Sequence, residues 1–319
     1  MKRPPLEPLS LADLATESLS ERPSKVGLSH LGRPWEPGGT LGDFLASLPC
    51  VLAAETFREA AGAIARAARG KRTVILALGA HAVKVGLSPV IIGAMRRGII
   101  TGLALNGAGV IHDTELALAG KTSEDVAERL GGGAFGMARE TAEFINGAVA
   151  EGYRRGGVGL GAAVGEALLQ SGAPHTDASL LAQAAALGVP ATVHVALGTD
   201  IIHMHPTCDG AATGALSHLD FRIFCRMVAG LAGGVHINLG SAVVLPEVFL
   251  KAVSVALNLG HSLSGLTTLN MDFVRHYRPE TNVVRRPTAG RGRGLTLVGH
   301  HEIMFPLLLA AVAENLSRE

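Results

Sequence analysis

The stretch Ala191-Thr-Val-His-Val-Ala-Leu-Gly-Thr-Asp200-Ile-Ile-His203-Met-His205-Pro-Thr-Cys-Asp209-Gly210 joins an apolar, β-branched run to a loop rich in ionisable side chains. In open α/β sheets, ligands bind just beyond the carboxyl ends of the strands. Loops at that edge also carry chemistry more often than the scaffold beneath them. We therefore expect a strand over 191–197 that delivers this polar loop to a binding cleft.

The same pattern recurs elsewhere in the chain, where strand-like runs lead into glycine and polar side chains. Because the carboxyl ends of parallel strands meet at one edge of a sheet, these runs predict a single shared cleft. They are 73–78 before Gly79-Ala-His81, 99–105 before Asn106-Gly107-Ala-Gly109, and 295–298 before Gly299-His300-His301-Glu302.

Helix-length segments separate the strand-like runs, and this alternation is typical of parallel βαβ units. The sequence therefore predicts an α/β fold. Arginine, proline and glycine in 275–294 suggest a basic loop. The expected helices are 55–69, 89–97, most of 135–188, 218–231, 246–259 and 302–316, and the further strands are 235–239 and 265–269.

Prolines and polar residues dominate the beginning of the chain, which predicts an N-terminal Pro-rich arm over 1–45. Such an arm either packs on a neighbour or stays mobile. The remainder, 46–319, is expected to form a single domain because no linker divides it.

Composition narrows the class of protein. The net charge of +1 gives no electrostatic reason to expect nucleic-acid or membrane binding. The three cysteines include no CxxC pair, and no apolar segment follows the first residues as in a signal peptide. The longest apolar segments are broken by polar residues and favour buried elements over membrane spans. We therefore expect a cytoplasmic protein.

Three segments resemble known binding-site motifs, but each lacks a feature that its motif requires. Gly131-Gly-Gly133-Ala-Phe-Gly136 fits GxGxxG but follows a helical segment instead of the strand that a dinucleotide fingerprint needs. Gly120-Lys121-Thr122 ends like a P-loop, but Glu115 occupies the position of the first glycine. His301-Glu302-Ile-Met-Phe305 lacks the second histidine of a zincin helix.

Asn106-Gly107-Ala108-Gly109 is a better signal, because a Gly-rich turn before a helix lets backbone N–H groups approach phosphates. The alternative is that glycine only makes the turn. Lys84 has apolar neighbours, and burial would favour a role as base or nucleophile. More often such a lysine extends to solvent or pairs with a carboxylate.

His203 and His205 point to the same side of an extended segment. With Asp200, Asp209 and His112 they could bind a metal through nitrogen and oxygen. A hydrogen-bonded network around an organic ligand explains them better, because no spacing here is diagnostic of a metal.

Several landmarks, in the same order, resemble the deoxyhypusine synthase family over about residues 50–315. The resemblance is stronger to the bacterial deoxyhypusine-synthase-like branch than to the authentic enzyme. The landmarks are Asn106-Gly-Ala-Gly-Val110-Ile-His-Asp113, the Gly-Thr-Asp200 turn, Leu231-Ala-Gly-Gly234-Val235, Arg278-Pro279 and Phe305-Pro306-Leu-Leu308.

The resemblance implies a Rossmann-like parallel sheet with helices on both faces. It also implies NAD at the strand ends and a homotetramer whose sites lie between subunits. His81 stands where the family has an asparagine, and His300 where it has an aspartate. The implied NAD contacts are His81, Asn106, Gly107, Gly109, Asp200, Gly233, Gly234, Thr267, Thr268 and His300.

The departures from the family concern its chemistry. After its Arg-Pro, the synthase carries a lysine that forms a covalent imine, but 278–287 contains no lysine here. Arginine is no substitute, because it stays protonated and is a poor nucleophile. The family's Lys-His-His is replaced by His236-Ile237-Asn238. We therefore expect that this protein does not make deoxyhypusine.

The sequence thus predicts an NAD-dependent enzyme that acts on a small amine or amino acid by oxidoreductase or transferase chemistry at a C–N bond. Cyclodeamination of an amino acid is one such reaction. His203 and His205 are expected to move protons. Asp209 and Glu302 would orient groups or bind a cation, and Lys84 would serve as anchor or base.

Two other classes of function stay open at this point. One is a metal-dependent hydrolase or lyase that uses the histidines and aspartates of the 200–209 loop to activate water. The other is a non-catalytic binding protein that kept the fold and lost its chemistry, because fold alone does not determine function.

Overall fold

Aliphatic residues fill the central strand 74–78, because a parallel strand that is covered on both faces reads as a continuous apolar run. Val74–Leu78, with the sequence VILAL, is buried at every position. The computed structural model describes residues 4–317, so positions 1–3 of the predicted arm and 318–319 of the predicted domain lie outside the described residues. The strands are β1 (Val74–Leu78), β2 (Gly102–Asn106), β3 (Ala191–His194), β4 (Val235–Leu239), β5 (Leu266–Asp272) and β6 (Gly292–Val298).

The strands form one parallel sheet in the order β3-β2-β1-β4-β5-β6. The predicted α/β fold with a Rossmann-like sheet is confirmed. The chain builds outward from β1 to β3 and then returns to the other side of β1 with β4. This reversal places a topological switch point between β1 and β4, where open sheets bind ligands at their carboxyl edge.

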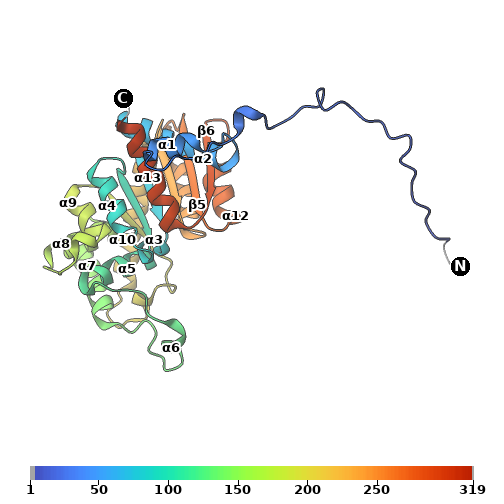
Figure 1. Ribbon diagram of the computed structural model, residues 1–319. Coiled ribbons are helices and arrows are strands. Elements are labelled where there is room, and N and C mark those ends of the chain that lie inside the picture. The colour runs from blue at the N-terminus through green and yellow to red at the C-terminus, as the bar shows by residue number, and fades with distance from the viewer. Residues whose placement is uncertain (1–3, 318–319) are drawn as a thin grey trace.

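Helices cover both faces of the sheet (Figure 1). Apolar side chains of α2, α4, α5 and α13 join Val74, Leu76 and Leu78 of β1 in one core cluster. Those of α10 and α11 join Ile75 and Ala77 in a second cluster on the other face. The helices of at least seven residues are α1 (Leu41–Ser47), α2 (Leu52–Arg69), α4 (Ser88–Arg96), α5 (Gly107–Ala119), α7 (Arg139–Arg155), α8 (Leu160–Gln170), α9 (Leu180–Leu187), α10 (Gly210–Ala229), α11 (Val244–Asn258) and α13 (His301–Ser317).

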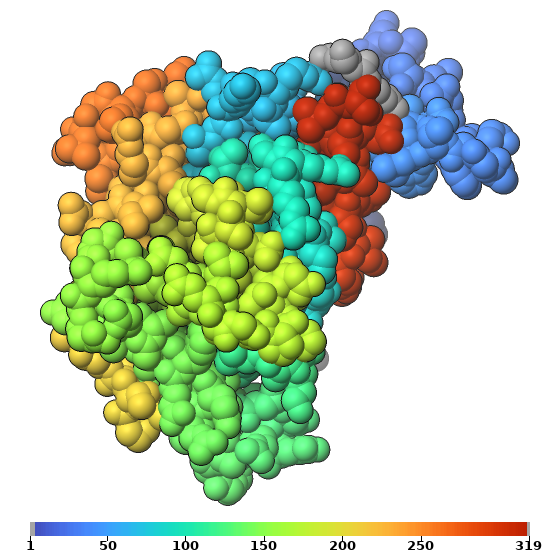
Figure 2. All heavy atoms as spheres, turned by 90° about the vertical axis from the view of Figure 1, so that its left-hand side faces the viewer, coloured from blue at the N-terminus to red at the C-terminus, as the bar shows by residue number. Residues whose placement is uncertain are grey.

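Shorter helical turns connect these elements. Figure 2 shows α8 and α9, in yellow-green, on the side of the molecule where β3 ends the sheet, with the green segment between α5 and α7 below them. The short helices are η1 (Leu28–His30), α3 (Ala80–Lys84), α6 (Val126–Leu130), η2 (Thr176–Ala178), η3 (Ile201–Met204), α12 (Tyr277–Pro279) and η4 (Glu280–Arg285).

The predicted basic loop 275–294 is wrong in its central part. Residues 280–285 form a π-helix in which Val283 joins the second core cluster and Val284 lies against Gly294 of β6. Arg286 donates a hydrogen bond to Asn282 Oδ1 at 2.9 Å. The basic composition of the segment predicted a loop. In the structure its arginines face solvent, while the two valines are buried.

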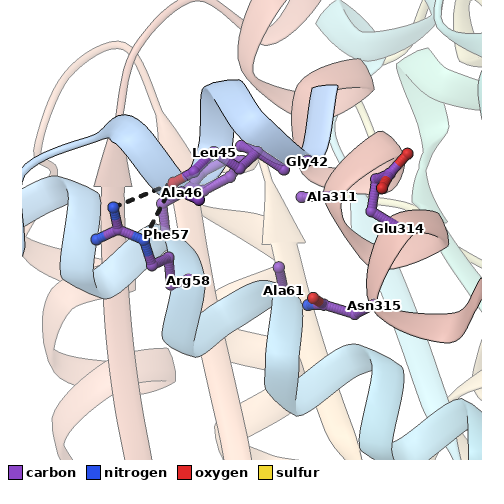
Figure 3. Close-up of a pocket in the computed structure, with 9 residues that line it drawn as sticks. All are labelled: Gly42, Leu45, Ala46, Phe57, Arg58, Ala61, Ala311, Glu314 and Asn315. Carbon is purple, nitrogen blue, oxygen red and sulfur yellow. Dashed lines mark hydrogen bonds between the residues drawn. The ribbon is translucent and has the colours of Figure 1, made fainter. Parts of the chain in front are cut away.

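The predicted arm runs away from the body of the protein (Figure 1). It has no helix longer than η1 between residue 4 and residue 40, and its leucines are exposed. The chain joins the body at α1, where a cavity of about 190 Å³ opens between α1, α2 and α13 (Figure 3). Arg58 at this cavity donates to the carbonyl oxygens of Leu45, Leu48 and Pro49, so its guanidinium holds α1 on α2.

Within residues 4–317, no helix is both long and apolar enough to cross a bilayer.

Candidate functional site

A cavity of about 240 Å³ lies above the carboxyl ends of β2 and β3. Its walls come from α3, from the first turns of α5, from the 123–126 segment and from the turn after β3. Two predicted site residues, Lys84 and Asp200, line it, so the structure brings these two together. The lining residues are Lys84, Ala108, Ile111, His112, Glu115, Ser123, Glu124, Val126, Phe135, Thr199, Asp200 and Ile201.

Asp200 is the unusual group in this cavity. It is only 8% exposed, and its Oδ2 has no hydrogen-bond partner in the described structure. Burial raises the pKa of its carboxyl group, although nearby His203 lowers it in part. A Cβ on Gly107 would lie 1.9 Å from Asp200 Oδ2, so only glycine at this position leaves room for the carboxylate.

Two acceptors therefore occupy the N-terminus of α5. Asn106 caps the helix, because its Oδ1 accepts a hydrogen bond from the Gly109 amide at 2.9 Å. The Asp200 carboxylate lies against Gly107 in the same turn. A phosphate placed there would meet a carboxylate, so the geometry argues against phosphate contacts at Gly107 and Gly109. It favours a cation or a hydrogen-bond donor instead.

Lys84 is exposed at the edge of the cavity, so the burial on which its predicted role as base depends is absent. Its position still suits an anchor for an anionic group. Glu302 is exposed in the first turn of α13 with its carboxylate 3.8 Å from His300 Nδ1, and it does not line the cavity.

The predicted proton-transfer histidines are engaged elsewhere. His203 Nδ1 accepts hydrogen bonds from the backbone N–H groups of Gly198 at 3.2 Å and Asp200 at 3.4 Å. His203 thus holds the turn that presents Asp200. His205 Nδ1 lies 2.8 Å from Thr207 Oγ1, and neither histidine lines the cavity. The described residues contain no group of three or more potential metal ligands, so the structure does not assemble the alternative metal site.

Asp209 has a structural explanation. Its Oδ1 accepts hydrogen bonds from the amides of Ala211 and Ala212, which makes it the N-cap of the twenty-residue helix α10. It does not line the cavity.

We predict that Asp209→Ala lowers the free energy of unfolding by about 1 kcal/mol, because a lost N-cap leaves helix amides without partners. Ligand binding should be unchanged. Urea denaturation and ligand titration measure the two effects, with Thr40→Ala, which uncaps only the seven-residue α1, as the control. A variant of full stability that binds no ligand would restore Asp209 as a site residue.

A second polar group gathers at the switch point. The ring of His81, which follows β1, lies 5.6 Å from that of His301 and 5.9 Å from that of Phe273. His301 is 1% exposed, and neither of its ring nitrogens has a hydrogen-bond partner among the described residues. Burial lowers its pKa, although Asp272, whose Oδ1 is 3.8 Å from Nε2, opposes the change.

Exposed aromatic surface borders this group. Phe273 is 49% exposed and stacks on His300, with ring centroids 6.3 Å apart and ring planes within 6° of parallel. His300 and His81 therefore both contact Phe273 at one crevice of the carboxyl edge, although the strands that precede them are not neighbours in the sheet.

Four of the predicted NAD contacts lie elsewhere. Gly233 and Gly234 precede β4, and Thr267 and Thr268 belong to the first half of β5. They therefore lie toward the amino edge, and the five residues of β4 separate the glycines from the crevice by roughly 16 Å at 3.3 Å per residue. The structure does not bring these four together with Asn106 and Asp200.

Sequence reasoning missed His301, Asp272 and Phe273. The predicted strand 265–269 ends before Asp272, whereas β5 continues through it. Extending that strand by its apolar alternation would have placed Asp272 at the carboxyl edge. No sequence signal showed that His301 rather than Glu302 turns inward.

No family model and no curated protein matches the chain. Among solved structures, AgrE in a ternary complex with ornithine and NAD+ matches with a TM-score of 0.53 and 12% identity, over 84% of this chain and 35% of that one. A conserved putative LOR/SDH protein from Methanococcus maripaludis S2 gives 0.52 and 13%, over 83% of this chain and 71% of that one.

A putative deoxyhypusine synthase from Entamoeba histolytica matches with a TM-score of 0.49 and 11% identity, over 90% of this chain and 98% of that one. The chain spans about a third of the length of AgrE and of ArgZ, an arginine dihydrolase that also matches. At these identities the likeness shows the fold alone. The chain shares the α/β fold of AgrE and the LOR/SDH protein, and a putative deoxyhypusine synthase is among the structures that it resembles.

Proposed function

We propose that this protein is an NAD-dependent enzyme of the deoxyhypusine-synthase-like fold that acts on a small amine or amino acid. The observation that carries the proposal is the buried carboxylate of Asp200, whose Oδ2 has no hydrogen-bond partner among the described residues, in a cavity beside the switch point of the sheet. A buried carboxylate without a partner is costly, and a ligand's ammonium group would satisfy it.

The cavity suits a cationic amine. Three carboxylates line it, those of Glu115, Glu124 and Asp200, against the single ammonium group of Lys84. An amino acid would place its ammonium group near Asp200 and its carboxylate toward Lys84. AgrE, which shares the fold, has been solved with ornithine and with L-arginine, and this agrees with the proposed class of ligand.

The switch point fits a dinucleotide. Both ring nitrogens of His301 need polar partners, and Gly79 permits close approach of the backbones at the crevice. His81, His301 and the exposed Phe273–His300 stack would hold the cofactor there, and Asn106 would contact it from the end of β2. NAD held there would supply an acceptor for a hydride from the carbon that bears the nitrogen, or a donor that returns it.

The lack of a lysine in residues 278–287 excludes a covalent imine between this segment and the substrate. Residues 278–287 lie in α12, in the π-helix and just beyond it, and contain no amine that could form an imine with a butylamine group. The proposed activity is therefore redox chemistry at a C–N bond, either net or recycled within one turnover, without a covalent lysine intermediate.

We also propose that copies associate as a homotetramer through the exposed apolar side chains beside the crevice. Phe273, Val274, Tyr277, Val298 and Ile303 are each at least 46% exposed around the ends of β5 and β6. An exposed apolar patch of this kind marks an interaction surface.

Native mass spectrometry of the purified protein, followed by denaturation, tests the cofactor and the assembly together. We expect a tetramer that releases NAD. A protein that carries a metal and no nucleotide, and that takes up no added NAD, would overturn the proposed function.

The amine site is tested separately by calorimetric titration with L-ornithine. Asp200→Asn should weaken binding by roughly 10- to 100-fold, because a charged hydrogen bond is worth about 1.5–3 kcal/mol. Asp177→Asn, an exposed aspartate in η2, is the matched control. Equal affinity in wild type and Asp200→Asn would remove Asp200 from the site.

A further inference from the structure

A chain of hydrogen bonds lies where the cavity meets a second one. The Thr122 hydroxyl lies 2.7 Å from His112 Nδ1 and donates to Glu115 Oε2. Thr141 donates to the other oxygen of Glu115 at 3.2 Å. His112 and Glu115 line the Asp200 cavity, whereas Thr122, Thr141 and again Glu115 line the neighbouring cavity of about 510 Å³.

The direction of these bonds defines the tautomer of His112. A threonine hydroxyl has one hydrogen, and here it is directed to Glu115. The same oxygen must therefore accept from His112, which places a hydrogen on Nδ1 and leaves the lone pair on Nε2. No described residue hydrogen-bonds Nε2, and it is not among the sealed polar atoms without a partner.

Glu115 carries the charge that supports this arrangement. Burial raises its pKa, but hydrogen bonds from His112, Thr122 and Thr141 outweigh that effect and lower it below its usual value. An ionised Glu115 stabilises an imidazolium at His112 through the Thr122 hydroxyl and through its own oxygen 3.6 Å from Nδ1.

We propose that His112 is the proton acceptor of this site and that Thr122 and Glu115 are the residues that position it. This inference rests on the proposed function and names a base for it. A substrate ammonium group near Asp200 gives its proton to His112 Nε2. Loss of that proton leaves a lone pair on nitrogen, which can form the C=N bond as the carbon loses its C–H electron pair. Bound NAD+ would supply the acceptor for that hydride, so charge and atoms balance.

The other predicted bases are less suited to this role. His203 uses Nδ1 to accept hydrogen bonds from backbone amides, and it does not line the cavity. His205 does not line the cavity. The charged groups that line the cavity together with His112 are Glu115, Glu124, Asp200 and Lys84.

Nitrogen-15 NMR of the histidine side chains tests the hydrogen-bond chain His112–Thr122–Glu115 without cofactor or substrate. The His112→Gln variant identifies which signals belong to His112. We expect a neutral His112 with its hydrogen on Nδ1. Thr122→Val should give a mixture of tautomers, and Thr122→Ser should restore the wild-type signal. A wild-type His112 with its hydrogen on Nε2 would overturn the proposal.

The catalytic role is tested by NADH formation from NAD+ with L-ornithine as probe. His112→Gln should lower the rate by roughly 100-fold or more and remove the rise in rate with pH that titration of a base produces. Thr122→Val should shift that rise while leaving KM for L-ornithine little changed, and exposed His218→Gln is the control.

A His112→Gln variant with the wild-type rate and pH profile would exclude His112 as the base. Absence of NADH from wild type with L-ornithine, L-arginine and putrescine would instead overturn the proposed function. The NMR measurement needs none of these compounds. It therefore tests the His112–Thr122–Glu115 hydrogen-bond chain independently of the proposed NAD-dependent activity.

Discussion

Gly79→Ala is expected to abolish nucleotide retention and to lower the free energy of unfolding by about 3 kcal/mol or more. A Cβ on Gly79 would lie 2.3 Å from the carbonyl oxygen of Gly240, a contact between two backbones that no side-chain rotation relieves. Relief requires β1 and β4 to separate at their carboxyl ends, where the crevice lies. Urea denaturation and quantification of nucleotide released from the purified variant measure both effects.

Gly93→Ala is the matched control, because its Cβ would meet nothing within 4 Å inside α4. Alanine is favoured over glycine within a helix, so this variant should gain about 0.5–1 kcal/mol and keep its nucleotide. If Gly79→Ala were as stable as Gly93→Ala and retained as much nucleotide, the proposal that the cofactor binds at the switch point would be wrong.

Asp220→Asn is expected to stabilise the protein at pH 8 and to change little at pH 4. Burial raises the pKa of Asp220 from 3.8 to about 7, despite hydrogen bonds from the amides of Val193, Gly161 and Leu160. The folded state therefore holds a proton that the unfolded chain has released between pH 4 and pH 7. The stability that this proton contributes is full below pH 4 and is lost as the pH rises through 7.

At about 1.4 kcal/mol for each pKa unit, the difference between Asp220→Asn and wild type at pH 8 approaches, as an upper limit, on the order of 4 kcal/mol. Asparagine keeps an oxygen for the backbone amides and carries no charge at any of these pH values. Urea midpoints at pH 4, 6 and 8 follow the change. A difference that is independent of pH would show that Asp220 is ionised throughout.

The sheet was predictable because its strands are buried on both faces. Residues 74–78 are a continuous apolar run, whereas 235–239 alternate apolar residues with His236 and Asn238. Glycine follows both segments, and both became strands within one residue of the predicted bounds. The π-helix over 280–285 was not predictable, because its two buried valines lie among arginines and prolines that are typical of loops.

The site was predictable in its location but only partly in its residues. The predicted ends of the strands identified the carboxyl edge of the sheet, and Asp200 and His81 lie at that edge. The roles of His203 and Asp209 were not predictable, because a polar residue that caps a helix or fixes a turn looks the same in sequence as one that meets a ligand. Gly233 and Thr267 lie toward the other edge for a topological reason, since position along a strand decides which edge a residue reaches.

The meeting of His81 with His301 has a consequence during synthesis of the chain. His81 follows the first strand, whereas His301 follows the last, so the crevice closes only after nearly all of the chain has been made. Contacts between such distant positions form late, because their loop-closure entropy is paid before they stabilise anything. The two ligand sites proposed above therefore differ in when they can form: every residue that lines the Asp200 cavity lies between 84 and 201, whereas the His81–His301 contact waits for the last strand.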